Sequence, residues 1–148
     1  MTKFFRLSTS LLIFLQGLIL VLVLFTDKIH IPLAFLGRLH PLVLHIPIGF
    51  GVFLVLIFVL KKWIDSNAFQ EIFRFLLYLT SIFSSITAIF GMFLSSEGGY
   101  DLVQITFHQW AGLGVNWLYV LLLFAYEKGY LEGKNLFYSV LVGLASFL

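Results

Sequence analysis

Histidine side chains stand out in this sequence because they interrupt segments that are otherwise almost entirely apolar. His40 and His45 lie within residues 38–49, and His108 lies in a later apolar segment. An ionisable side chain is costly inside a bilayer, so an intramembrane histidine indicates a functional site by default. Neutral imidazole binds haem iron and also binds copper or zinc. These histidines therefore predict a metal or haem site.

The segments that carry the histidines have the length and composition of membrane spans. The chain has 148 residues, of which 61% are hydrophobic and 11% charged, and its mean hydropathy is +1.06. Continuous apolar runs of about 20 residues indicate transmembrane helices and lack the alternation of a transmembrane barrel. We therefore predict one all-α membrane domain over residues 1–148, with four full spans and an incomplete fifth, at about 7–25, 40–60, 72–94, 105–126 and 136–148.

The distribution of lysine and arginine predicts the orientation of these spans. Seven of the nine basic residues fall on one side, whereas Lys28 and Arg38 fall on the other. By the positive-inside rule the N-terminus is cytoplasmic. The starts of the second and fourth spans then face outward, which places His45 and His108 within about 5–8 Å of the outer boundary, at 1.5 Å per helical residue.

Two histidines from separate spans at a similar depth are what a b-type haem with two imidazole ligands requires. Gly49 follows His45 by four residues, and Gly112 follows His108 by four, so each glycine shares a helix face with its histidine and opens a flat slot there. We expect haem b with His45 and His108 as iron ligands. The remaining residues of this predicted site, which would face the haem propionates at the water boundary, are Arg38 and His40.

His40 and His45 are expected to have separate roles. On a regular helix residues five apart point about 140° away from each other. Pro41 suits the first turn of the second span, and Pro47 removes one helical hydrogen bond. A histidine near lipid headgroups can also simply be solvated. In the third span, the spacing of Ser81, Ser84, Ser85, Ala88 and Gly91 predicts a close helix–helix contact, with hydroxyls bonded to the backbone.

Two stretches resemble a family of bacterial membrane proteins. Residues 37–49, with the pattern His-Pro-x-x-x-His-x-Pro, and residues 98–101 and 108–112 are similar to the DUF2231-like domain. That domain often precedes a cytochrome-c-like module. The resemblance implies a multi-pass domain of the bacterial inner membrane that is associated with redox chains. It also implies a further Gly-His-x-Gly-Gly-like segment, so we expect the natural protein to continue beyond Leu148.

The resulting hypothesis is a membrane electron-transfer domain that exchanges electrons with a periplasmic or fused cytochrome c within a larger membrane complex. One alternative is a non-catalytic anchor or structural subunit of an envelope complex. Another is a copper or zinc site formed by His40, His45 and His108. The sequence has no cysteine, which excludes thiolate metal sites and covalently attached c-type haem. No basic cluster suggests a nucleic-acid partner.

Overall fold

The computed structural model describes residues 2–25 and 34–129, and all regular secondary structure in these residues is helical. The predicted all-α fold is therefore confirmed for this part of the chain, whereas the predicted fifth span at 136–148 lies outside it. The elements in chain order are α1 (Thr2–Phe25), the short 3₁₀ helix η2 (Ala34–Leu39), α2 (His40–Val59), the 3₁₀ helix η3 (Leu60–Trp63), α3 (Ser66–Ser95) and α4 (Leu102–Glu127).

Three of the helical segments are long and apolar enough to cross a membrane. They are Phe35–Trp63, Ser66–Ser95 and Leu102–Glu127. Within α1, Thr9–Phe25 forms a shorter apolar helix. A helix needs about 20 apolar residues to cross the hydrocarbon core. These helices indicate a multi-pass membrane protein with a lipid bilayer as its environment.

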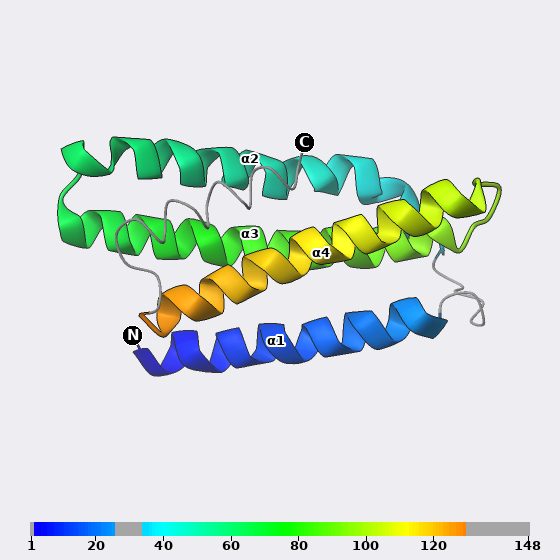
Figure 1. The fold of residues 1–148 in the computed structure, drawn as a ribbon, viewed down its shortest axis with the longest axis horizontal. Coiled ribbons are helices and arrows are strands. Elements are labelled where there is room, and N and C mark those ends of the chain that lie inside the picture. The colour runs from blue at the N-terminus through cyan, green and yellow to red at the C-terminus, as the bar shows by residue number, and fades with distance from the viewer. Residues whose placement is uncertain (1, 26–33, 130–148) are drawn as a thin grey trace.

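The helices run side by side, and α3 lies between α2 and α4 and packs against both (Figure 1). Helix α1 packs against α3 and α4. At one end of the bundle η2, the last turn of α3 and the first turns of α4 come together, and we call this the histidine end. The opposite end holds η3, the start of α3 and the end of α4, and we call it the lysine end (Figure 1).

Aspartate residues define where the two longest helices begin. The side chain of Asp65 accepts hydrogen bonds from the backbone N–H groups of Asn67 and Ala68, at 2.9 and 3.2 Å. Asp101 accepts one from the N–H of Gln104 at 2.9 Å. Each carboxylate satisfies N–H groups that have no partner within the helix. Because of the Asp65 cap, α3 starts upstream of the predicted position near residue 72.

The second span agrees with its predicted limits of about 40–60. Helix α2 begins at His40, and Leu39 occupies the capping position. The helix continues without interruption through Pro47, which is buried. Two glycines with positive φ angles, Gly98 at 76° and Gly99 at 82°, form the turn from α3 to α4. Glycine adopts such angles without steric cost.

A buried polar network joins α1 to α3 and α4. The Gln16 amide nitrogen donates to Ser85 Oγ at 2.8 Å, and the Asn116 amide nitrogen donates to Gln16 Oε1 at 2.6 Å. Ser84 Oγ and Ser85 Oγ donate to Asn116 Oδ1 at 2.9 and 3.1 Å. Ser81 Oγ donates to the carbonyl of Leu77. The single hydroxyl hydrogen of Ser85 is shared between Asn116 Oδ1 and the carbonyl of Ser81, which lies 2.8 Å from Ser85 Oγ. Ser81, Ser84 and Ser85 therefore lie at a close helix–helix contact, as predicted for α3.

Candidate functional site

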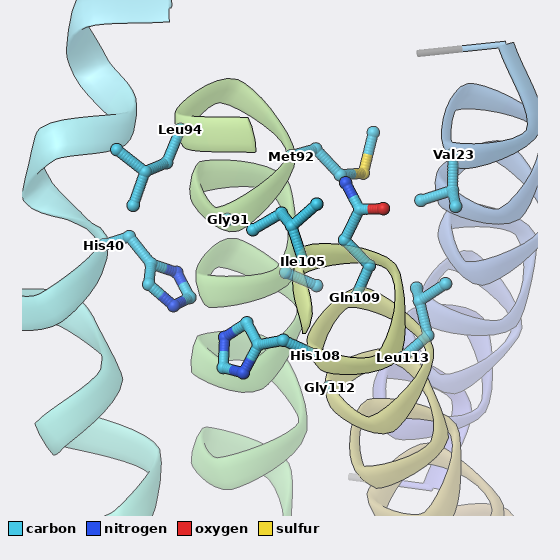
Figure 2. A pocket seen from close by; sticks show the side chains of 11 residues that line it. Val23, His40, Gly91, Met92, Leu94, Ile105, His108, Gln109, Gly112 and Leu113 are labelled. Carbon is cyan, nitrogen blue, oxygen red and sulfur yellow. The ribbon is translucent and has the colours of Figure 1, made fainter. Parts of the chain in front are cut away.

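Two imidazole rings meet at the histidine end of the bundle. His40 stands at the first residue of α2, and His108 lies in the second turn of α4. Their ring centroids are 6.0 Å apart, and the ring planes are nearly perpendicular, at 85°. Figure 2 shows the two rings next to each other, one reaching from each helix, with α3 behind them. The structure thus places two imidazole side chains from separate helices in one location.

The ring of His40 is held by the backbone of α3. Its Nδ1 lies 3.0 Å from the carbonyl oxygen of Thr87. A carbonyl oxygen only accepts hydrogen bonds, so Nδ1 carries the proton and donates it. In the neutral ring Nε2 then carries the lone pair, which is the form that binds a metal. This hydrogen bond therefore fixes the tautomer of His40 as well as its orientation.

Gly91 leaves the space that the His40 ring occupies. A Cβ atom at position 91 would lie 3.1 Å from Cε1 and 3.2 Å from Nδ1 of His40. Thr87 and Gly91 are four residues apart, so they lie on the same face of α3. That face supplies both the acceptor for the ring and the room for it.

The short helix η2 brings His40 to this position. A Cβ atom at Gly37 would overlap the backbone of Leu94 and Phe93, so η2 lies directly on the last turns of α3. The exposed side chain of Arg38 forms an ion pair with Glu97, with Nε 3.1 Å from Oε1. Because His40 follows η2 without a gap, these two contacts determine where α2 starts.

A small cavity of about 60 Å³ lies beside the two rings. Apolar side chains and glycines make up most of its wall, and the polar groups that face it are the two imidazoles and Gln109 (Figure 2). The Gln109 amide nitrogen donates to Ser95 Oγ at 2.7 Å, which connects α4 to the end of α3. About 10–15 Å³ of such cavity volume holds one water molecule, so the cavity has room for an ion and a few water molecules.

The other predicted site residues occupy different places. His45 is exposed on α2, and its Nδ1 lies 2.6 Å from the carbonyl oxygen of Pro41 in the same helix. Gly49 has open space beside it. Gly112 lines the cavity, and a Cβ atom there would meet nothing within 4 Å. The structure therefore brings His40, rather than His45, to His108, and the ligand role of His45 stays a prediction.

Among residues 2–25 and 34–129, no group of three or more His, Cys, Asp or Glu side chains is placed to hold a metal ion. The histidine pair offers two imidazole ligands. Sequence reasoning missed Thr87 entirely and interpreted Gly91 as a packing residue. Their shared face on α3 could have been noticed, because a hydroxyl residue and a glycine four residues apart lie opposite the start of the second span.

Comparison of the chain with protein-family models, with curated proteins and with solved structures found no match. The resemblance to the DUF2231-like domain therefore stays a prediction. It depends on residues 37–49, 98–101 and 108–112, which include both histidines of the pair and part of the turn between α3 and α4.

Proposed function

We propose that this protein is a membrane electron-transfer domain that binds b-type haem between His40 and His108. The observation that supports this function most directly is the meeting of two imidazole rings from separate helices, with their centroids 6.0 Å apart. Imidazole nitrogens are ligands of haem iron, and the two rings come from separate helices. His40 and His108 would therefore hold the iron through one ring nitrogen each.

The residues around the pair have identifiable tasks in this proposal. The Thr87 carbonyl keeps the proton of His40 on Nδ1 and leaves Nε2 as the ligand atom. Apolar side chains line most of the cavity beside the two rings, while His108 itself is exposed. Arg38 lies exposed two residues before His40, where a cationic group can pair with propionates. Haem itself supplies reversible one-electron transfer when it is bound.

Haem binding requires space for the porphyrin as well as two ligands, and the space is the harder condition to meet. Pockets for ligands of drug size measure about 300–1,000 Å³, so a cavity of about 60 Å³ does not enclose a macrocycle. Helices α2 and α4 each pack on α3, however, so a ring system can lie between them without breaking either contact. The glycine at position 112 adds clearance on α4.

The small cavity also favours a second candidate, a single copper or zinc ion bound by His40 and His108 with water. Both metals accept imidazole ligands. Such a site needs no space outside the cavity. It differs from the haem proposal in its visible spectrum and in its metal content.

The direction of the chain in the membrane belongs to the same proposal. Lys61, Lys62, Arg74 and Lys128 lie at the lysine end, whereas Arg38 at the histidine end is paired with Glu97. The positive-inside rule then places the lysine end and the N-terminus in the cytoplasm, with α1 as a fourth span. The histidine pair would lie near the periplasmic face of a bacterial inner membrane, within reach of a periplasmic or fused cytochrome c.

The visible spectrum of the detergent-purified full chain tests this proposal. We expect a Soret band and sharp α and β bands after reduction, and we expect His40→Ala and His108→Ala each to remove them. His45→Ala is the matched control on the same helix and should keep the spectrum. Loss of the spectrum in His45→Ala, with retention in His40→Ala, would overturn the ligand assignment.

Two colourless outcomes reject haem. A colourless protein that contains about one copper or zinc ion per chain supports the single-ion site instead. A colourless, metal-free protein that folds normally rejects both candidates and leaves the chain as a non-catalytic anchor in a larger membrane complex.

A further inference from the structure

Gly91 lies against the proposed ligand His40 and also lines the cavity beside the two rings. Its missing side chain leaves room for the ring, with Cε1 at 3.1 Å and Nδ1 at 3.2 Å from a Cβ atom at that position. Real Cβ atoms rarely approach other atoms so closely. A Cβ atom at position 91 therefore requires the ring of His40 to shift by a few tenths of an ångström.

The ring cannot move without a change in its hydrogen bond. In an α-helix, the carbonyl of residue 87 accepts from the N–H of residue 91. His40 Nδ1 uses the second lone pair of that same carbonyl, at 3.0 Å. Because Gly91 closes this helical turn and lacks a side chain, the Thr87 carbonyl stays open to a donor from α2. The space beside Gly91 and the carbonyl of Thr87 thus act together on the ring of His40.

We propose that Gly91 is the positioning residue that makes His40 the ligand partner of His108 and Nε2 its ligand atom. This inference rests on the proposed function for the role of the ligand. On this inference α3, which carries neither histidine, orients the ring of His40. A hydrogen bond at the outer nitrogen of a ligating histidine raises the basicity of the ligand, so this arrangement also affects the midpoint potential of a bound iron.

The test compares Gly91→Ala with Gly114→Ala. Gly114 is an exposed helical glycine of α4 at which a Cβ atom meets nothing within 4 Å. We expect Gly91→Ala to bind haem at reduced occupancy, and the haem that remains to have a higher midpoint potential, because the bond to Thr87 is weakened. The Gly114→Ala variant should match the wild type. Equal occupancy and potential in both variants would overturn the inference.

A second measurement does not need haem. In the ligand-free protein in detergent, Gly91→Ala should lower the melting temperature by about 2–4 °C. In a His40→Ala background the same substitution should leave the melting temperature unchanged or raise it, because the displaced ring is gone and alanine is the better helix former. The double variant also provides folded protein if Gly91→Ala alone does not fold.

The two measurements separate the possible failures. A wild-type protein without haem overturns the proposed function, while the melting cycle still decides whether Gly91 positions His40. A drop in melting temperature that persists in the His40→Ala background shows that position 91 contacts something else, and this result overturns the inference.

Discussion

At the scale of single residues, two buried carboxamide side chains show that the interior of this bundle contains a hydrogen-bonded polar network. The side chains of Gln16 and Asn116 are 0% and 1% exposed, and each is hydrogen-bonded to the other and to serines of α3. A polar group without a partner is expensive in a membrane interior. The network therefore specifies how α1 lies against α3 and α4, since only one register satisfies all of its members.

Replacement of Asn116 by alanine tests this network. The substitution removes the donor to Gln16 and the acceptor for Ser84 and Ser85, so we expect a loss of about 1–2 kcal/mol in the free energy of unfolding. Denaturation of the purified protein in mixed detergent micelles measures it. Gln104→Ala, at an exposed position of the same helix, should change stability by less than about 0.5 kcal/mol. Equal effects would show that the network contributes nothing specific.

The residues of the candidate site were only partly predictable from the sequence. His108 and Gly112 line the cavity, and the ring that meets His108 comes from His40. The 140° separation of His40 and His45 means that at most one of them can face α3 and α4. Sequence alone could not say which one, because that depends on where η2 lies. The two amides could have been noticed, since each interrupts an apolar run in which a polar group is costly.

At the scale of elements, η2 determines the position of the whole second helix. Its close approach to α3 depends on Gly37, and the ion pair between Arg38 and Glu97 adds a second connection. An exposed ion pair contributes about 0–1 kcal/mol. The glycine contact is therefore the stronger determinant, because no side chain fits between the two backbones.

Gly37→Ala should displace η2 from α3. We expect a loss of about 1–3 kcal/mol in the free energy of unfolding from overpacking, together with a loss of the haem spectrum as His40 moves. Gly17→Ala is the matched control, because a Cβ atom there meets nothing within 4 Å. Alanine is the better helix former by about 1 kcal/mol, so the control should be neutral or stabilising. An unchanged stability in Gly37→Ala would contradict the close contact.

The limits of α2 and α4 were predicted to within a few residues, since apolar runs determine them. The start of α3 was placed too late, because its first turns are polar and apolar periodicity does not detect them. The aspartate at position 65 is the local signal that extends this helix. The position of η2 on α3 leaves no periodic pattern at all, since a single glycine allows it.

At the scale of the whole molecule, the basic residues of the described chain favour one end. Arg74 pairs with Glu127 at 2.9 Å, whereas Lys61 and Lys62 are exposed beside the exposed Trp63. Lysine and tryptophan at a helix end are typical of a membrane boundary. The lysine end therefore has the composition of a membrane boundary, which the orientation proposed above assigns to the cytoplasm.

Cysteine labelling can test this orientation without background, because the sequence contains no cysteine. We expect Tyr100→Cys, in the turn after α3, to react with a membrane-impermeant maleimide in cells whose outer membrane is permeabilised. Lys62→Cys should react only after the inner membrane is opened, and so should Thr2→Cys if α1 is a full span. If Lys62→Cys reacted before the inner membrane was opened, the proposed orientation would be the wrong way round.

The central place of α3 has a consequence for assembly. Both histidine-bearing helices are seated on this third helix, so neither needs the other to find its place. Helices α2, α3 and α4 can thus pack together before a cofactor binds. On the proposed function, haem would then bind to two helices that already lie in place, and the haem-free protein would keep its helical fold.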